Sequence, residues 1–386
     1  MYSNKLDNYW SHSRKVAIVY DRVNKWGGAE RVLLSLNKIF PDAHLYTSVL
    51  NLKKAPWAKN FKKIETSFLQ NFPFASSFHQ GYATLMPIAF ESFSFDEYDL
   101  VISITSEAAK GIITKPGTLH ICYCLTPTRY LWSGYEDYFE NPYLRFLSKP
   151  AVSYLRTWDK ISAQRPDAFI AISKEVQKRI KKYYGRDSKV IYPPIDPAFS
   201  SKASSVQLNS KLNANKLEAK RYFLVVSRLV PYKKLDIAIA ACNELGLPLK
   251  IAGTGSQERF LKSIAGPTIE FLGELTDESL NNYYKNCRGL IFPGKEDFGL
   301  VMAEAQGFGK PVIAFGDGGA LEIIEEGKTG EFFEKQTPDS LKRVLVKFNG
   351  SRYNIKYCID SAQRFSFEKF EQKFTDFLNS KLNKNL

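Results

Sequence analysis

The chain has 386 residues, of which 44% are hydrophobic and 24% are charged, a composition typical of globular proteins. No apolar run reaches the ~18 residues of a membrane-spanning helix, and the polar start MYSNKLDNYW lacks the pattern of a signal peptide, so we expect a cytoplasmic protein. The length exceeds what one hydrophobic core comfortably serves and predicts two domains of about 150 to 200 residues.

The net charge of +14 suits nucleic acid, an anionic membrane or a phosphorylated ligand equally. No zinc-finger, RNP or basic-zipper pattern is present, so nucleic acid is not an expected partner. The five cysteines are scattered through apolar segments, and none of the four histidines is paired at metal-ligand spacing. We therefore expect buried free thiols, with neither disulfides nor a metal site.

In the first half of the chain, short apolar runs alternate with amphipathic helical patterns. These patterns predict strands at 15–21, 99–105, 120–124, 168–173 and 189–194, and helices at 28–40, 143–165 and 174–185. Apolar strands that alternate with helices predict a parallel sheet covered on both faces. Gly27 and Gly28, between the first strand and the first helix, allow either a close approach of the backbone to a ligand or a plain tight turn.

A basic and aromatic segment lies at residues 53–74. Its lysines and aromatic residues are Lys53, Lys54, Lys59, Lys62, Lys63, Trp57, Phe61, Phe68, Phe72 and Phe74. This mixture suits the surface of an anionic membrane. A solvated basic helix with its apolar side packed on the core is the alternative.

Residues 196–221 are polar and rich in serine and asparagine, and we expect them to link two domains. After them the alternation restarts, with strands expected at YFLVVSR, PLKIAGTG, IEFLGEL, GLIFPG and PVIAFG. The sequence therefore predicts an α/β protein with two doubly wound, Rossmann-like domains, at 1–198 and 199–365, whose ligands bind at the carboxyl ends of the strands. An amphipathic pattern predicts a last helix, and we expect residues 366–386 to return to the first domain.

Two cations follow the first expected strand of the second domain, in the run RLVPYKK. Arg228 and Lys233 would lie at the carboxyl end of that strand, where they could neutralise a diphosphate. Solvated surface charges are the alternative.

The stretch GKEDFGLVMAEAQGFG predicts a strand-to-helix loop that carries Glu296, followed by a helix. The first amides of that helix, at 298–301, would point at a ligand and favour an anion such as phosphate. Glu304, one turn into the helix, could accept hydrogen bonds from hydroxyls beside the anion, and Glu296 could reach a second polyhydroxylated group. A phosphate between two sets of hydroxyls describes a nucleotide sugar, and a capped, solvated helix start is the alternative.

Two further motifs resemble nucleotide-binding motifs but are incomplete, so neither an NTPase nor a dehydrogenase is expected. EGKTG contains the G-K-T of a P-loop without its first glycine, and GTGSQE lacks the third glycine of a dinucleotide fingerprint. No D-x-D occurs in the sequence, so a metal-dependent, single-domain transferase is not expected.

Several motifs occur in an order that resembles the retaining glycosyltransferases of family 4, which have the GT-B fold. These motifs are GGAERVL, SRLVPYKKLDIAI, EDFGLVMAEAQGFGKPVIAFGDGGALEII and EGKTGEFF. LMPIAFESF, CYCLTPTRYLW and VIYPPID further resemble the bacterial mannosyltransferase-like branch of surface-polysaccharide assembly. The resemblance implies a metal-independent hexosyltransferase without a cofactor. Its best-matching donor is GDP-mannose, and its acceptor is a glycan such as a lipid-linked oligosaccharide at the inner face of the membrane.

The resemblance also implies roles for individual residues. Glu296 and Glu304 match the paired glutamates of the E-x7-E motif, which contact the donor sugar and the nucleotide ribose. With Glu296, Arg228 and Lys233 form the implied catalytic set, since the two cations would hold the diphosphate. The remaining implied donor-binding positions act through the backbone and are Gly28, Phe298, Gly299 and Leu300.

One position departs from the family pattern. Relatives commonly have a histidine before the T-P of CYC-x-TP, where this chain has Leu125, so activity could be reduced or the donor altered. His120, at the start of the same strand, is expected to be structural. Two alternatives to a glycosyltransferase stay open: a hydrolysing nucleotide-sugar epimerase, which should need no acceptor, and a catalytically silent glycan binder.

Overall fold

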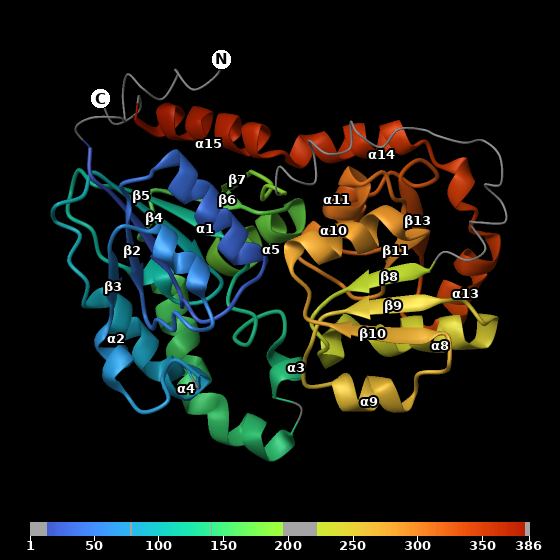
Figure 1. The fold of residues 1–386 in the computed structure, drawn as a ribbon. Coiled ribbons are helices and arrows are strands. Elements are labelled where there is room, and N and C mark those ends of the chain that lie inside the picture. The colour runs from blue at the N-terminus through green and yellow to red at the C-terminus, as the bar shows by residue number, and fades with distance from the viewer. Residues whose placement is uncertain (1–13, 78, 140, 196–221, 383–386) are drawn as a thin grey trace. The chain divides into compact units, whose positions relative to one another are not determined.

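The computed structural model describes most of the chain (Figure 1). The described residues are 14–77, 79–139, 141–195 and 222–382. The expected linker at 196–221 lies outside them. Contacts divide the chain into two compact units, Met1–Pro193 with Phe370–Leu386, and Pro194–Lys369.

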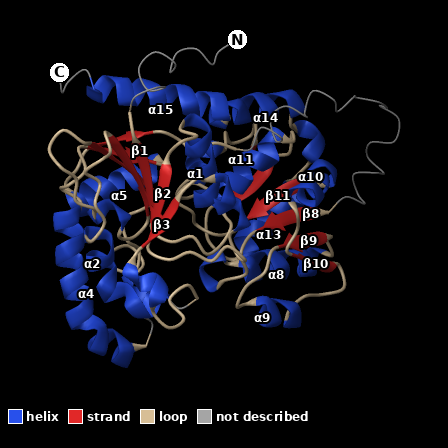
Figure 2. Ribbon diagram, turned by 60° about the vertical axis from the view of Figure 1, so that its left-hand side comes forward, coloured by secondary structure: helices blue, strands red, loops and turns tan. Residues whose placement is uncertain are grey.

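The first unit is built on a seven-stranded parallel sheet with the order β3-β2-β1-β4-β5-β6-β7. Its strands are β1 (Val16–Tyr20), β2 (His44–Thr47), β3 (Ile64–Thr66), β4 (Leu100–Thr105), β5 (Leu119–Cys124), β6 (Ala168–Ala171) and β7 (Ser188–Val190). Its helices include α1 (Gly28–Ile39), α2 (Met86–Glu91), α3 (Tyr135–Tyr138), α4 (Pro142–Ser162) and α5 (Lys174–Tyr184). Every residue of β1, β4 and β5 is buried, as expected for central strands covered on both faces (Figure 2).

The second unit is built on a six-stranded parallel sheet with the order β10-β9-β8-β11-β12-β13. Its strands are β8 (Phe223–Val226), β9 (Leu249–Ala252), β10 (Ile269–Gly273), β11 (Gly289–Phe292), β12 (Val312–Phe315) and β13 (Gly330–Phe333). Its helices are α8 (Leu235–Leu245), α9 (Glu258–Ser263), α10 (Asp277–Asn286), α11 (Leu300–Gly307), α12 (Ala320–Ile323), α13 (Pro338–Lys347) and α14 (Ile355–Ala362).

Each sheet has one point at which the chain order reverses. It lies between β1 and β4 in the first unit and between β8 and β11 in the second. The loops that leave two such neighbouring strands run in opposite directions and leave a crevice at the carboxyl edge of the sheet, where ligands of doubly wound folds bind. The two reversal points are therefore the places to look for functional side chains.

The last helix, α15 (Phe367–Leu382), belongs to the first unit from Phe370 onwards. The ring of Phe370 lies 6.1 Å from that of Tyr123 in β5, and the ring of Phe374 lies 6.4 Å from that of Phe40. These aromatic contacts attach the helix to the core of the first unit.

The burial of the cysteines agrees with the sequence expectation. All five cysteines are buried, and none of them forms a disulfide in the part of the chain that the structure describes. Within the described residues, no helix is both long enough and apolar enough to cross a membrane.

Candidate active site

The reversal point of the second sheet brings together the loops that follow β8 and β11, two directly paired strands. The loops approach so closely that a Cβ on Gly294 would lie 3.1 Å from the Cα and the carbonyl oxygen of Lys233. Glycine at this position therefore permits the contact. It also allows Lys233 and Glu296, which are expected site residues from different loops, to form an ion pair. Their side chains are only 13% and 17% exposed.

Arg228 is exposed to solvent and is linked to this ion pair through Tyr232. Its Nη2 donates a hydrogen bond of 2.5 Å to the hydroxyl of Tyr232. The ring centre of Tyr232 lies 6.0 Å from the Arg228 guanidinium and 5.2 Å from the Lys233 Nζ. Tyr232 thus contacts both cations, and sequence reasoning did not identify it as a site residue.

The helix that follows Glu296 begins as the sequence predicts. Gly299 caps α11 with a φ of 93°, a conformation that strains residues with a Cβ, and a Cβ there would also collide with the Met302 side chain. Phe298 is buried and packs against Phe365 at 5.2 Å between ring centres. The helix start is thus held by the core, and its N-cap residue, a glycine, supplies no side-chain hydrogen bond to the first amides.

A third loop supports the backbone around Glu296. The Gly319 amide, in the loop after β12, donates a hydrogen bond of 2.9 Å to the carbonyl oxygen of Glu296. A Cβ on Gly319 would collide with the carbonyl of Phe298. The neighbouring Lys295 forms an exposed ion pair of 2.7 Å with Asp317.

Glu304 is more deeply buried than Arg228, Lys233 and Glu296. Its side chain is 2% exposed, and its Oε2 accepts a hydrogen bond of 3.0 Å from the Tyr284 hydroxyl. The Tyr284 ring stacks on Phe308 at 5.5 Å. The carboxylate thus has a protein hydroxyl as a partner, a contact that sequence reasoning did not foresee.

In the first unit, Gly28 is the first residue of α1. The buried Glu30 lies in the same turn, and its Oε1 accepts a hydrogen bond of 2.6 Å from the Tyr20 hydroxyl. Its Oε2 is buried and has no hydrogen-bond partner among the described residues. A Cβ on Gly27 would lie 3.2 Å from that oxygen, so the glycine pair allows the turn to close over an inward-pointing carboxylate.

Asp21 joins the two strands at the reversal point of the first sheet. Its buried carboxylate accepts a hydrogen bond of 2.8 Å from the Thr105 hydroxyl and others from the backbone amides of Ser106, Ala108 and Ala109. Burial raises the pKa of Asp21, and the charge of Glu107 raises it further. Glu107 also forms an ion pair of 2.6 Å with Arg22. These buried polar contacts hold the loops that follow β1 and β4 together.

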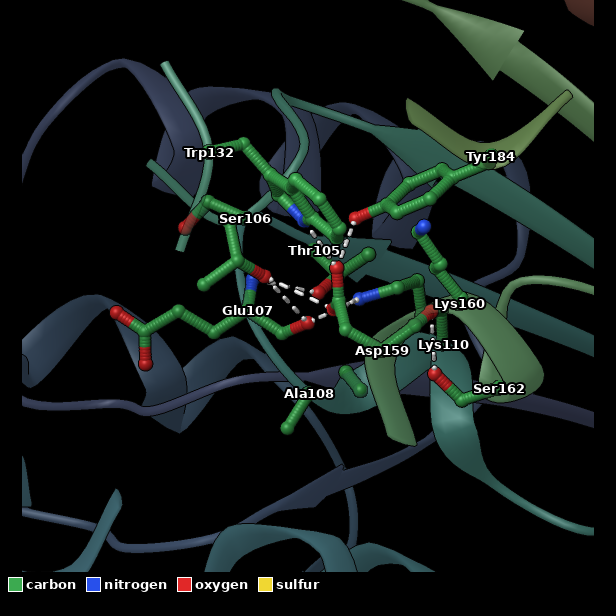
Figure 3. Close-up of polar contacts among 12 residues, drawn as sticks. Thr105, Ser106, Glu107, Ala108, Lys110, Trp132, Asp159, Lys160, Ser162 and Tyr184 are labelled. Atoms are coloured by element: carbon green, nitrogen blue, oxygen red, sulfur yellow. Dashed lines mark hydrogen bonds and ion pairs between the residues drawn. The ribbon is translucent and has the colours of Figure 1, made fainter. Parts of the chain in front are cut away.

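A buried network lies next to these loops (Figure 3). Asp159, in α4, accepts hydrogen bonds from Lys110 at 2.5 Å, Thr128 at 3.1 Å, Trp132 at 2.7 Å and Tyr184 at 2.8 Å. Burial opposes the charge on Lys110, but the Asp159 carboxylate outweighs it and raises the pKa of the lysine. The network fixes the LTPTRYLW loop to α4 and α5.

His120 and Leu125, which the sequence analysis singled out, both lie close in sequence to this loop. His120 is fully buried in β5, where its Nε2 lies 2.8 Å from the Ser103 hydroxyl, so its structural role is confirmed. Leu125 follows β5 directly, and its amide donates a hydrogen bond of 2.8 Å to the carbonyl of Thr105. Leu125 thus lies at the carboxyl edge of the sheet.

The basic and aromatic segment at 53–74 does not form one membrane-facing surface. Trp57 and Phe61 are only 8% and 5% exposed, and the Trp57 indole donates a hydrogen bond of 2.8 Å to the carbonyl of Lys25. Phe74, by contrast, is 82% exposed. The apolar packing of the alternative therefore holds for the first part of the segment. The expected single helix is wrong, because the segment forms a short 3-10 helix at Pro56–Asn60 and then the strand β3.

Comparison with known proteins relates the second unit to one family. Residues 209–363 match the family model described as glycosyl transferases group 1. The chain is 27% identical over 231 residues to the O-antigen chain mannosyltransferase C of Escherichia coli, covering 58% of each. It is 30% identical over 196 residues to the alpha-1,3/1,6-mannosyltransferase ALG2 of Dictyostelium discoideum, covering 42% of this chain and 47% of that protein. The chain thus spans about half the length of these curated relatives.

Solved structures extend the likeness to the whole fold. An Anabaena protein crystallised with UDP and glucose matches with a TM-score of 0.67 at 21% identity, covering 95% of this chain and 100% of that one. Sucrose-phosphate synthase from Thermosynechococcus elongatus matches with a TM-score of 0.70 at 15% identity, covering 96% and 100%. The chain has the GT-B fold, and residues 209–363 within it are similar to the family described as glycosyl transferases group 1.

Proposed function

We propose that the protein is a retaining glycosyltransferase of family 4 that transfers a hexose from a nucleotide sugar to a glycan. The observation that carries the proposal is the gathering of Arg228, Lys233 and Glu296 at the reversal point of the second sheet. All three lie within residues 209–363, the part of the chain that matches the glycosyltransferase model.

The chemistry of such a transfer explains why two cations are needed at this site. The bond between the sugar and the diphosphate breaks, so negative charge grows on the leaving group while the anomeric carbon becomes cationic. Arg228 can bind two phosphate oxygens with its planar guanidinium, and Lys233 supplies a second, compact charge. The amides that follow Gly299 would face the same anion.

Glu296 would position the sugar rather than attack it. Its carboxylate holds the Lys233 ammonium in the structure, and a bound diphosphate would compete for that ammonium. Glu296 could then accept hydrogen bonds from sugar hydroxyls. For retention, the acceptor hydroxyl would attack from the side of the leaving group, and the diphosphate would take its proton. The proposal therefore contains no protein nucleophile, and it assigns the nucleotide ribose to Glu304.

The donor and acceptor are proposed from the relatives. GDP-mannose is the favoured donor because relatives from both bacteria and a eukaryote are named mannosyltransferases. The Anabaena structure with UDP and glucose makes a uridine donor the first competitor. A lipid-linked oligosaccharide at the cytoplasmic face of a membrane is the favoured acceptor. In this proposal neither a cofactor nor a metal ion takes part.

A product scan tests the function. The chain is incubated with GDP-mannose or UDP-glucose, with and without a lipid-linked oligosaccharide extract, and the products are identified by mass spectrometry and by NMR of the anomeric centre. We expect transfer with retained configuration only when acceptor is present. Lys233→Ala should abolish it, whereas Lys295→Ala should not, because Lys295 points toward Asp317.

Other outcomes would assign the site differently. A new free sugar or sugar nucleotide formed without acceptor would identify a hydrolysing epimerase. Nucleotide-sugar binding without any turnover would identify a silent binder, the class that Leu125 makes conceivable. Transfer with inverted configuration would contradict the retaining mechanism.

A further inference from the structure

Helix α4 exposes an apolar face in addition to the face that it buries. Its buried face carries Val152, Leu155, Asp159 and Ser162. On another side, Tyr143, Leu147, Tyr154 and Ile161 follow one another at steps of four, seven and seven residues, which places them in one row along the helix. Their exposed fractions are 82%, 72%, 47% and 57%.

The exposed face is widest in the first turns of the helix. Leu144 is 60% exposed and Phe146 is 68% exposed, and both flank the row of apolar side chains. Figure 1 shows these first turns, in green, extending away from the sheet of the first unit. Soluble proteins expose large apolar side chains singly, whereas a group of this size marks an interaction surface.

The charges on α4 are almost all positive. The helix contains Arg145, Lys149, Arg156 and Lys160, and its one acidic residue is Asp159, so its net charge is four minus one, or +3. Asp159 is buried in its ion pair with Lys110. The charges of α4 that reach solvent are therefore all basic, and the Lys149 ammonium lies 5.4 Å from the ring centre of Phe146.

We propose that α4 docks the first unit onto an anionic membrane surface. The row of apolar side chains would enter the boundary between headgroups and acyl chains, while the basic residues face lipid phosphates. This charge pattern favours a bilayer over a second copy of the chain, because two copies paired through this face would bring like charges together.

The proposal rests on the proposed function, since a lipid-linked acceptor would be met at such a surface. It also moves the membrane contact away from residues 53–74, where two of the aromatic side chains belong to the core. Phe74 in that segment is exposed, so its replacement tests whether residues 53–74 contact the membrane instead.

Vesicle flotation of the full chain tests the proposal, with phosphatidylcholine vesicles that contain or lack phosphatidylglycerol. We expect binding that requires phosphatidylglycerol, at least tenfold weaker in Phe146→Ser/Leu147→Ser and in Lys149→Glu. Phe260→Ser is the matched control, because Phe260 is 50% exposed on α9 of the second unit. All replaced side chains are exposed, so the unfolding midpoints should stay unchanged.

Three results would overturn the proposal. Unchanged binding of the α4 variants would show that the helix is not the contact. Loss of binding in Phe74→Ser alone would return the contact to residues 53–74. A dimer of the wild type that the Phe146→Ser/Leu147→Ser variant dissociates in light scattering, without vesicle binding, would make α4 an interface between copies.

A probe on the helix supplies an independent readout. Since all five native cysteines are buried, Tyr143→Cys can be labelled with an environment-sensitive fluorophore under native conditions. Its emission should shift to the blue with anionic vesicles, and that of labelled Phe260→Cys should not. Nucleotide binding measured on the same samples separates the two proposals. Vesicle binding without nucleotide binding would contradict only the proposed glycosyltransferase function. Nucleotide binding without vesicle binding would contradict only the membrane docking through α4.

Discussion

Acid should destabilise the first unit through one buried histidine. His120 is fully buried, and burial, with smaller contributions from Arg165 and Arg186, lowers its pKa from 6.5 to about 3. The native state therefore binds fewer protons than the unfolded state between these values, so the free energy of unfolding falls as pH falls through this window. For these two pKa values, linkage predicts a loss of about 2 kcal/mol between pH 7 and pH 5.

Urea unfolding at the two pH values measures this loss. All five tryptophans lie between residues 1 and 193, so tryptophan fluorescence reports on the first unit. His120→Gln keeps a polar group for the Ser103 hydroxyl but cannot titrate, and it should lose about 2 kcal/mol less than the wild type. His79, whose pKa burial lowers to about 4, contributes equally to both proteins. Identical pH dependence in the two proteins would refute the reasoning.

Two further variants test the scaffold of the sites. Lys110→Met leaves the Asp159 carboxylate buried without its cation, which should lower the free energy of unfolding in urea by about 3–5 kcal/mol. Adding Asp159→Asn to this variant should recover part of the loss. An unchanged unfolding midpoint in Lys110→Met would contradict the buried ion pair. Gly319→Ala places a methyl group against the carbonyl of Phe298, which should cost about 1–3 kcal/mol and weaken nucleotide binding. Gly134→Ala is its control, since the nearest atom to the added Cβ is the Arg129 carbonyl oxygen at 3.5 Å and the backbone there has a φ of −117°. Equal effects of the two would show that crowding is not the cause.

The central strands of both units could be predicted from the sequence because continuous apolar runs mark them. The expected run at 99–105 corresponds to β4, and GLIFPG contains β11. Strands β2, β3 and β13 were not predicted. Each contains polar residues, so no continuous apolar run marks it, and β3 and β13 lie at the edges of their sheets.

The candidate active site could be predicted in part. Arg228, Lys233 and Glu296 stand near strand ends, where loops of doubly wound sheets carry function. That Lys233 pairs with Glu296 could not be read from the sequence, because the two are 63 residues apart and meet only through the strand order. Tyr232 gave no signal beyond its position between two cations.

The remaining features that the sequence did not predict depend on segments that meet only in the folded chain. The partners of Asp159 come from separate elements, so no local pattern announces them. In residues 53–74, aromatic residues alternate irregularly with lysines, and the buried Trp57 donates a hydrogen bond to the carbonyl of Lys25, which is distant in sequence. The exposed apolar face of α4 could not be predicted from the sequence. The hydrophobic periodicity predicts a helix there, but it does not say which apolar side faces the core.

Calorimetry of nucleotide binding tests the central claim most directly. GDP, UDP and ADP, with their sugar conjugates, are titrated into the wild type, Arg228→Ala and the control Arg352→Ala, which removes an exposed arginine elsewhere in the second unit. We expect the wild type to bind one nucleotide selectively. Its affinity should weaken by at least about tenfold in Arg228→Ala, because a charge-assisted contact to phosphate contributes about 1.5–3 kcal/mol. The affinity should stay unchanged in Arg352→Ala. No binding of any nucleotide, or equal binding by Arg228→Ala, would contradict a diphosphate site at the reversal point of the second sheet.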